Sequence, residues 1–298
     1  MEFRVLRYFL AVAGEKSITR AAQILHITQP TLSRQLMELE EELGKKLFIR
    51  GKRNLILTDE GILLKKRAAE ILELVEKSER EIKVSDEIIN GDIYIGGGES
   101  DAVRIIAQIT KKLQKDHPHI CYHLFSGNAD DVMERLDKGL LDFGVLIEPV
   151  DIKKYEYIKF PVTDIWGVLM RKDSPLAVNK TIKSQELINL PLICSRQTLV
   201  REDISKWLGK DLNKLNLVST YNLIYNASLM VEEGTGYALC LDKLINTTGN
   251  SILCFKPLEP KLEVGLYIVW KKSQIFSKAG KKFLEKLQTE LNKKDETI

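Results

Sequence analysis

The first 58 residues carry the apolar spacing of short helices, separated by residues that cap helix ends. Ser17 and Thr28 are suited to N-cap two helices predicted over residues 18–25 and 29–42, because their hydroxyls accept hydrogen bonds from free backbone N–H groups. Gly44 then marks the end of the second helix. The pattern predicts two helices joined by a short link.

The second of these helices divides into an apolar face and a polar face. Leucines recur along it at spacings of four, three and four, which places them within one narrow arc of a helical wheel. These are Leu32, Leu36, Leu39 and Leu43. Pro30, Arg34 and Met37 point the opposite way. We therefore expect the leucines to be buried and the opposite face to be exposed.

A hairpin and a long helix are predicted next. Two short strands over residues 48–50 and 55–57 flank a basic tip, and Thr58 can cap a proline-free helix over residues 59–89. One stripe of this helix alternates spacings of four and three, as in a coiled-coil seam. Its members are Leu64, Ala68, Ile71, Val75, Ser78, Ile82, Ser85 and Ile89. We expect the helix to dimerise; the alternative is one amphipathic helix lying on its own domain.

From Gly91 onward, strand patterns alternate with helix patterns. The predicted strands cover residues 93–95, 120–125, 143–147 and 266–269, and the predicted helices cover 101–116, 129–138, 223–232 and 274–292. This rhythm favours a parallel sheet with helices on its faces. The chain is therefore expected to be α/β in class beyond the N-terminal helices.

Charge is concentrated at the N-terminal end of the chain. Residues 1–58 hold ten Lys and Arg against six Asp and Glu, whereas the remaining residues hold 35 against 36. A local basic patch on an otherwise balanced protein indicates a polyanion partner for that part alone.

The exposed face of the second helix carries side chains suited to double-stranded DNA. Gln29 and Arg34 can make bidentate contacts with adenine and guanine, while Thr28, Thr31 and Ser33 can bind phosphates. Basic residues at the hairpin are placed as a wing would be: Arg50, Lys52 and Arg53. The alternative is an ordinary helical hairpin with a solvated polar face, which would leave the basic hairpin and the local charge excess unexplained.

These residues closely resemble the signature of LysR-type transcriptional regulators. The matching runs are SITRAA at residues 17–22, LHITQPTLSRQL at 25–36, LEEELG at 39–44, LFIR at 47–50 and LTDEG at 57–61. The resemblance implies a winged helix-turn-helix, a dimerising linker helix, and an effector domain similar to periplasmic solute-binding proteins. It also implies that Gln29, Pro30, Thr31, Ser33 and Arg34 approach bases, and that many members form dimers of dimers, so a homotetramer is expected.

The resemblance continues more loosely to the C-terminus. LDKGLLDFGV at residues 136–145 and VEEGTGY at 231–237 are similar to the glycine turns of the two family lobes. The implied domains are a DNA-binding domain at 1–58, a linker helix at 59–90 and an effector domain at 91–298. Within the last, lobe I is expected at about 91–162 and 266–298, and lobe II at about 163–265. The chain would cross between the lobes near residues 160–163 and 264–266.

Small-molecule ligands of open α/β sheets bind beyond the carboxyl ends of strands, at helix N-termini. That rule selects polar and glycine residues after each predicted strand, although each one alone could be a simple turn or cap. The selected residues are Gly98, Glu99, Ser100, Asp101, Ser126, Gly127, Asn128, Glu148, Ser195, Arg196 and Gln197.

Two carboxylates set this pocket apart from a common family pattern. Glu99 and Asp101 stand where many members carry small hydroxyl residues. Because carboxylates would repel an anion, we expect an amine-bearing or polyhydroxyl effector rather than a simple dicarboxylate, unless Arg196 dominates.

A metal sensor is one alternative function. His119, Cys121 and His123 alternate along a predicted strand and so share a face, but an ordinary strand with mixed polar residues is the favoured interpretation. The four cysteines form no close pair and are expected to be reduced and mostly buried. We expect no cofactor and no bound metal.

Enzyme and transport functions are disfavoured. The glycines at residues 96–98 lack the Gly-Lys-Ser/Thr of a phosphate loop, and no Gly-x-Ser-x-Gly elbow is present. A secreted solute binder would need a signal peptide, but the apolar segment 8–13 is too short for one. Phe3, Leu6 and Leu10 instead recur at helical spacing. We expect a cytoplasmic protein.

Overall fold

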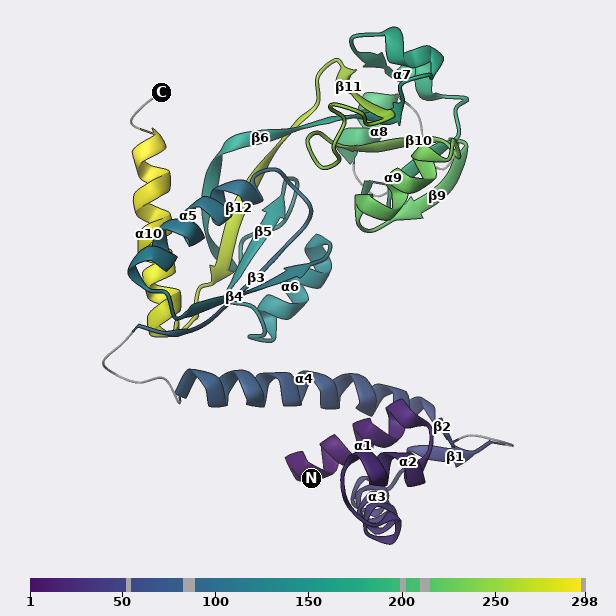
Figure 1. Ribbon diagram of the computed structural model, residues 1–298, viewed down its shortest axis with the longest axis vertical. Helices are drawn as coiled ribbons and strands as arrows, with labels where there is room; N and C mark the ends of the chain where they lie inside the picture. Colours follow the sequence, from purple (N-terminus) through teal and green to yellow (C-terminus); the bar gives the residue numbers. More distant parts are fainter. Residues whose placement is uncertain (52–54, 83–88, 199–201, 210–214, 296–298) are drawn as a thin grey trace. The chain divides into compact units, whose positions relative to one another are not determined.

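The computed structural model describes residues 1–51, 55–82, 89–198, 202–209 and 215–295. The chain divides into two compact units, Met1–Lys83 and Val84–Ile298 (Figure 1). Among the described residues, no helix combines the length and the apolar character that crossing a bilayer requires.

The first unit is a small helical bundle with a two-stranded hairpin. Its elements are α1 (Phe3–Glu15), α2 (Ile18–Ile24), α3 (Gln29–Leu43), β1 (Phe48–Arg50), β2 (Leu55–Leu57) and α4 (Asp59–Ile82). The antiparallel hairpin pairs Phe48 with Leu57. Phe9 of α1 and Leu32 of α3 are fully buried in the shared core. These elements confirm the predicted pair of helices, hairpin and long helix.

The predicted caps are present. The Ser17 hydroxyl accepts the Arg20 N–H and the Thr28 hydroxyl accepts the Thr31 N–H, each at 3.4 Å. Gly44 ends α3 in the left-handed conformation, with φ of 63°. One prediction is wrong: Leu43 is 41% exposed, because it is the last residue of α3 and the chain turns away through Gly44.

The long helix α4 begins as predicted, with the Thr58 hydroxyl accepting the Gly61 N–H at 3.0 Å. Its described part ends at Ile82; Ser85 lies outside the described residues, and Ile89 is not helical. Ala68 and its neighbours in the predicted seam, Leu64 and Ile71, pack on the core of their own unit. The first half of the seam therefore follows the alternative of a helix lying on its own domain.

The second unit has two lobes that share one long strand. Strand β6 (Tyr155–Arg171) pairs with β12 (Glu263–Lys271) through Ile165, and with β10 (Tyr237–Leu241) and β11 (Leu253–Glu259) from Trp166 onward. The chain thus passes from one lobe to the other within β6, close to the crossing expected near residues 160–163.

Lobe I is a mixed sheet covered on both faces. The strand order is β4-β3-β5-β12-β6, with β3 parallel to β4 and β5, and β12 antiparallel to β5 and β6. The remaining elements are β3 (Gly91–Gly97), α5 (Val103–Asp116), β4 (Ile120–Ser126), α6 (Ala129–Asp137), β5 (Phe143–Ile147) and α10 (Lys278–Asp295). The predicted parallel arrangement is confirmed for β3, β4 and β5, whereas β12 is antiparallel to its neighbours because the chain returns from lobe II in the opposite direction.

Lobe II repeats this layered plan. The order β6-β10-β8-β9 continues the sheet, with β8 parallel to β10 and β9. Its further elements are a 3₁₀ turn (Pro175–Val178), β7 (Ile182–Lys183), α7 (Ser184–Leu187), β8 (Leu192–Ser195), α8 (Glu202–Leu208), β9 (Leu217–Tyr221) and α9 (Ile224–Glu232). Buried Val168, Leu192 and Leu239 lie in its core.

Candidate functional site

The polar face of α3 is open to solvent. Gln29, Pro30, Thr31 and Arg34 are exposed, and Ser33 is half-buried. The Thr28 and Thr31 hydroxyls lie 2.8 Å apart at the helix start. Exposed hydroxyls and a helix N-terminus are suited to phosphate oxygens.

The guanidinium of Arg34 is held by a partner on its own helix. Arg34 Nε donates to Glu38 Oε1 at 2.8 Å, and Gln35 Nε2 donates to Glu38 Oε2 at 2.7 Å. The Arg34 side chain is 77% exposed. Because exposed pairs of this kind contribute only about 0.3–0.5 kcal/mol, a base or phosphate can replace Glu38 at little cost.

A buried carboxylate that sequence reasoning missed joins α3 to the hairpin. Glu40 accepts hydrogen bonds from the backbone N–H groups of Leu47 at 2.8 Å and Phe48 at 3.3 Å, and from Lys46 Nζ at 2.7 Å. Burial alone would raise the pKa of Glu40, but these donors together hold the pKa below its ordinary value. Glu40 thereby fixes the start of β1 relative to α3.

The hairpin tip lies only partly within the described residues. Arg50 ends β1 and Gly51 follows it, whereas Lys52 and Arg53 lie outside the described residues. The expected contacts of this wing with DNA therefore rest on the sequence.

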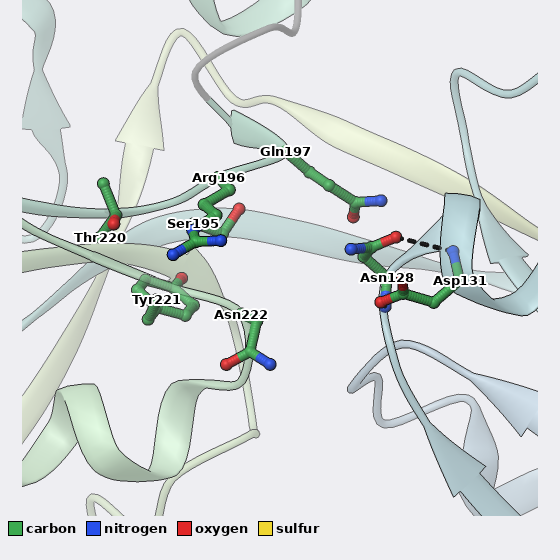
Figure 2. A pocket seen from close by; sticks show the side chains of 8 residues that line it. All are labelled: Asn128, Asp131, Ser195, Arg196, Gln197, Thr220, Tyr221 and Asn222. Atoms are coloured by element: carbon green, nitrogen blue, oxygen red, sulfur yellow. Dashed lines mark hydrogen bonds between the residues drawn. The ribbon is translucent and has the colours of Figure 1, made fainter. Parts of the chain in front are cut away.

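A cavity of about 350 Å³ lies between the lobes of the second unit. Figure 2 shows residues of lobe I on one side of it and residues of lobe II on the other. The lining residues are Asn128, Asp131, Ser195, Arg196, Gln197, Thr220, Tyr221 and Asn222. Each of these side chains carries a hydroxyl, amide or charged group, so the cavity suits a polar small molecule.

Local hydrogen bonds hold the lobe I side of this cavity. Asn128 caps α6 by accepting the Asp131 N–H at 2.9 Å, and the Asp131 carboxylate accepts the Asn128 N–H at 3.4 Å. This reciprocal capping box fixes both side chains at the helix start. The carboxylate of Asp131 lines the cavity while it serves as part of the cap.

Backbone and hydroxyl contacts shape the lobe II side. The Ser195 hydroxyl accepts the Thr198 N–H at 3.0 Å, and the Arg196 N–H donates to the Tyr221 carbonyl at 3.0 Å. The Tyr221 hydroxyl donates to the Leu239 carbonyl at 2.8 Å, and burial raises its pKa well above 10. Tyr221 therefore stays neutral, and Arg196 supplies the positive charge in the lining.

Glu99 connects the two lobes. Its carboxylate follows β3 in lobe I and accepts the N–H of Ile224, the first residue of α9 in lobe II. Burial raises the pKa of Glu99, and the hydrogen bond from Ile224 offsets part of that rise. A negative charge at a helix N-terminus is favourable, so the carboxylate occupies a place that an anionic ligand would otherwise take.

The other residues selected after the lobe I strands have structural partners. The Ser100 hydroxyl accepts the Ala102 N–H, and Asp101 forms an ion pair with Arg104 at 3.0 Å. Gly98, Ser126 and Gly127 also lie at the ends of β3 and β4. None of these residues is in the described cavity lining.

Glu148 lies at the end of β5, away from the described lining. Its carboxylate accepts hydrogen bonds from the Gly265 N–H at 3.0 Å, from Lys159 Nζ at 3.1 Å and from the Tyr267 hydroxyl. The hydroxyl of Tyr267 is the main cause that lowers the pKa of Glu148, with help from Lys159 and Gly265. Glu148 thus joins β5 to β6 and β12.

Sequence reasoning missed four lining residues: Asp131, Thr220, Tyr221 and Asn222. Thr220 and Tyr221 end β9, and Asn222 follows it; this strand was not among the predicted ones. The segment LVSTY at 217–221, which holds two β-branched residues and a tyrosine and is bounded by Asn216 and Asn222, is the signal that would have found it.

An exposed helix-turn-helix face with a basic hairpin, joined in one chain to a two-lobed unit with a polar cavity, defines a ligand-responsive transcription regulator. Residues 3–62 match the family described as bacterial regulatory helix-turn-helix protein, lysR family. Residues 88–292 match the LysR substrate binding domain. The chain belongs to the LysR family of DNA-binding transcriptional regulators, with a helix-turn-helix domain and an effector-binding domain; this is not a family of enzymes.

Characterised relatives agree with this assignment. The chain is 34% identical over 199 residues to the HTH-type transcriptional regulator BsdA of Bacillus subtilis strain 168, covering 66% of this chain and 67% of BsdA. It is 28% identical over 280 residues to the Hca operon transcriptional activator HcaR of Escherichia coli K12, covering 92% and 93% of the two chains.

Solved structures share the fold. Full-length CbnR in complex with its target DNA superposes with a TM-score of 0.76 at 18% identity, covering 97% of this chain and 99% of CbnR. Full-length BenM gives a TM-score of 0.55 at 23% identity, covering 99% and 98%.

Proposed function

We propose that this regulator reads its operator through α3, with Gln29, Ser33 and Arg34 at base edges. The single observation that supports this is the exposure of Gln29 and Arg34 on the first two turns of a helix whose other face is buried. Thr28 and Thr31 would bind phosphates, Pro30 would approach bases, and Arg50, Lys52 and Arg53 would meet the DNA backbone or minor groove. Because operator DNA lies in the bacterial cytoplasm, the regulator would act there.

Selection of operators from a random-sequence duplex pool tests the DNA proposal. The full chain should enrich a defined sequence, and Arg34→Ala should weaken its binding by about 1–3 kcal/mol and relax preference at one position. Lys52→Ala should weaken all sequences alike and reduce the salt slope by about one. Lys111→Ala, exposed on α5, is the control. Lack of enrichment, or normal binding by both variants, would contradict the proposal.

We further propose that the chain forms a homodimer through α4 and a homotetramer from two dimers. Leu63 and Leu74, eleven residues or about three turns apart on one face of α4, are 59% and 40% exposed and can pack on a second copy. Light scattering should show that Leu74→Asp lowers the oligomeric state. Lys180→Asp, an exposed charged position just before β7, should not. A monomeric wild-type chain would overturn the proposal.

We propose that the effector binds in the cavity between the lobes and carries hydroxyl or amine groups. Asp131 and the amides of Asn128 and Asn222 can accept or donate hydrogen bonds to such groups. Glu99 already supplies the carboxylate at the start of α9, which disfavours a second one there.

Calorimetry with the full chain tests the effector class. The probes are a hexitol, an amino sugar and succinate at equal ionic strength. The polyhydroxyl or amine probes should bind, and Asn128→Ala should weaken them more than Asn179→Ala, which lies near α7. Tighter binding of succinate would overturn the proposed chemical class of the effector. Equal effects of the two substitutions would overturn the proposed binding site between the lobes.

A further inference from the structure

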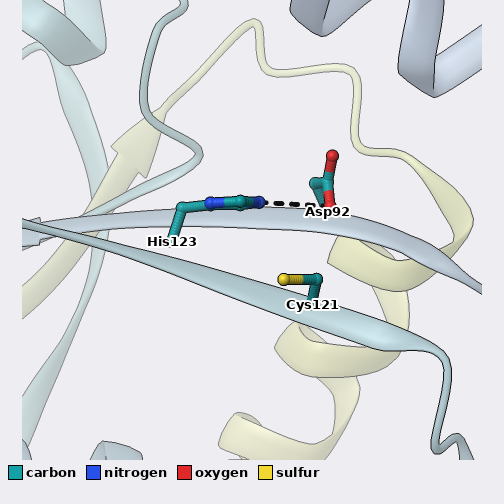
Figure 3. Close-up of side chains that lie close together, drawn as sticks. All are labelled: Asp92, Cys121 and His123. Carbon is teal, nitrogen blue, oxygen red and sulfur yellow. Dashed lines mark ion pairs between the residues drawn. The ribbon is translucent and has the colours of Figure 1, made fainter.

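Three metal-ligating side chains meet at the outer edge of the lobe I sheet. Strands β3 and β4 are paired in register, with Asp92 opposite Cys121 and Tyr94 opposite His123. Alternation along a strand therefore puts all four side chains on one face. The ligand atoms of Asp92, Cys121 and His123 lie within 4.8 Å of one another (Figure 3). Strand β4 is the end strand of the sheet order.

Two of the ligand atoms of this cluster lie especially close together. His123 Nε2 lies 3.2 Å from Asp92 Oδ1. That nitrogen is shielded from solvent, yet its approach to the carboxylate lacks the geometry of a hydrogen bond. A buried nitrogen beside a carboxylate is stabilised when one cation serves both. Cys121 is the exposed cysteine beside them, whereas Cys194 and Cys240 are buried.

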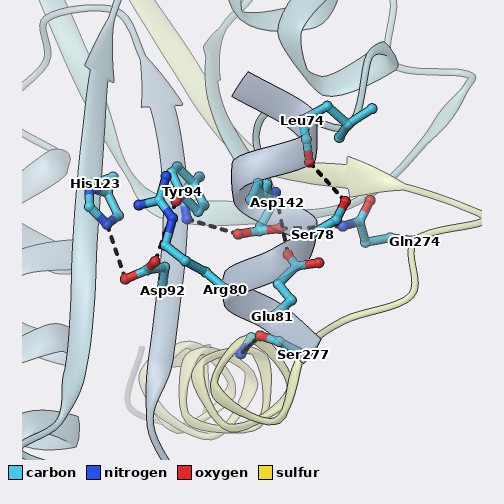
Figure 4. A network of polar contacts seen from close by, with 12 residues as sticks. Leu74, Ser78, Arg80, Glu81, Asp92, Tyr94, His123, Asp142, Gln274 and Ser277 are labelled. Atoms are coloured by element: carbon cyan, nitrogen blue, oxygen red, sulfur yellow. Dashed lines mark hydrogen bonds and ion pairs between the residues drawn. The ribbon is translucent and has the colours of Figure 1, made fainter. Parts of the chain in front are cut away.

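Surrounding side chains hold the ligands in place. The Tyr94 ring stacks on the His123 ring with centroids 4.6 Å apart, and its hydroxyl donates to Asp92 Oδ2 at 3.5 Å. Asp142 holds strand β3, because its carboxylate accepts a hydrogen bond from the Tyr94 N–H at 2.8 Å. The same carboxylate accepts a hydrogen bond from Gln274 at 3.4 Å (Figure 4). Outer residues that orient ligands in this way are characteristic of metal sites.

We infer that Asp92, Cys121 and His123 bind a divalent ion of the zinc class. Thiolate, imidazole and carboxylate are the ligands that Zn²⁺ accepts, whereas Mg²⁺ and Ca²⁺ take oxygen ligands. Tetrahedral bonds of about 2.0–2.3 Å bring ligand atoms closer together than 4.8 Å, so Cys121 must rotate inward, which its exposure allows. Water completes the fourth position.

This site is separate from the proposed effector cavity. Asp92 and Cys121 are the second residues of β3 and β4, whereas Asn128 and Asp131 follow the carboxyl end of β4. The site differs from the histidine-rich grouping considered from the sequence, because His119 lies in the turn before β4 and Asp92 replaces it. The sequence-based expectation of no metal did not foresee a carboxylate supplied by the neighbouring strand.

Zinc titration of the chelator-treated full chain tests the site. Competition against a chromophoric chelator should reveal one saturable site, and Cys121→Ser and His123→Asn should each weaken it at least about tenfold. His119→Asn and Cys254→Ser are matched controls that should keep wild-type affinity. Equal affinity in all five proteins, or the same loss in the controls, would overturn the inference.

Cobalt substitution identifies the ligands directly. The Co²⁺-loaded wild-type chain should show a thiolate-to-cobalt charge-transfer absorption, which Cys121→Ser should abolish and Cys254→Ser should keep. Far-ultraviolet circular dichroism checks that each variant is folded. Zinc binding without this absorption would place the ion elsewhere and would also overturn the inference.

Discussion

Gly61 shows how one residue fixes the start of the linker helix. A Cβ atom at this position would lie 2.2 Å from the Leu47 carbonyl oxygen, so the close packing of α4 on the residue before β1 requires glycine. This contact and the Thr58 cap account for two residues of the LTDEG run at 57–61: the glycine is needed for close packing, and the threonine caps α4.

Gly61→Ala is expected to destabilise the first unit by about 1–3 kcal/mol, because the clash involves backbone that cannot move away easily. Alanine would otherwise stabilise a helix by about 1 kcal/mol. Gly14→Ala in α1 is the control, since no atom lies within 4 Å of its added Cβ. Hydrogen exchange of the first unit in the full chain measures both. Equal protection changes in the two variants would contradict the argument.

Glu40 makes the junction between α3 and the hairpin sensitive to pH. Its pKa is lowered from 4.5 in the folded chain, so its stabilising effect is complete above about pH 4.5 and is lost as the pH falls through the folded pKa. The same carboxylate satisfies two backbone donors that would otherwise be left unpaired.

Glu40→Gln should lower the free energy of opening at the Leu47 and Phe48 amides by about 1–2 kcal/mol at pH 7, because a neutral acceptor replaces a charged one. The difference from wild type should shrink as the pH falls below 4.5, where wild-type Glu40 also becomes neutral. Hydrogen exchange at matched intrinsic rates tests this. A difference that is constant with pH would show that charge is not the cause.

At the scale of elements, local signals were enough to place most helices and strands β1 to β5 and β12, whereas β6 to β11 were not predicted. Ser17, Thr28 and Thr58 cap the helices they were predicted to cap, and β5 has the predicted bounds. Capping and apolar spacing depend on residues within a few positions of each other, so sequence alone reveals them.

Contacts between distant residues could not be predicted in this way. Glu99 and Ile224 are 125 positions apart, and Glu148 and Gly265 are 117 apart. Their pairing depends on how β6 and β12 join the two lobes. For the same reason, Glu148 was expected at the effector site but holds strands together. The buried and exposed faces of α3 could be predicted more readily, because the residues that form both faces belong to one short segment of the sequence.

The Arg34–Glu38 pair bears on how α3 reaches DNA. Glu38→Gln should leave folding nearly unchanged, because the exposed pair contributes little. It should tighten DNA binding by about fivefold, since a carboxylate near a phosphate costs about 1 kcal/mol in water. Fluorescence anisotropy with the selected operator measures the change. Glu156→Gln, exposed on β6, matches the change in net charge and should bind as wild type does. Equal tightening by both would assign the effect to net charge.

At the scale of the molecule, Glu99 links the lobes of the second unit through a single carboxylate. Because burial raises its pKa above 4.5, the charged form is disfavoured in the folded chain. Stability from this group is therefore complete below about pH 4.5 and falls as the pH rises through the folded pKa. In its charged form this buried carboxylate is only partly compensated, by the hydrogen bond from the Ile224 N–H.

Glu99→Gln should separate the two effects, because the amide oxygen can still accept the Ile224 N–H while the buried charge is gone. The melting temperature of wild type relative to this variant should fall between pH 4.5 and 7, whereas Glu186→Gln within α7 should show no such trend. An amine-bearing effector would compensate the carboxylate, so its stabilisation of the wild-type chain should exceed that of the variant. Equal stabilisation of both would mean that the effector does not act on Glu99, and the lobes would then have to close around the ligand by contacts in the cavity lining alone.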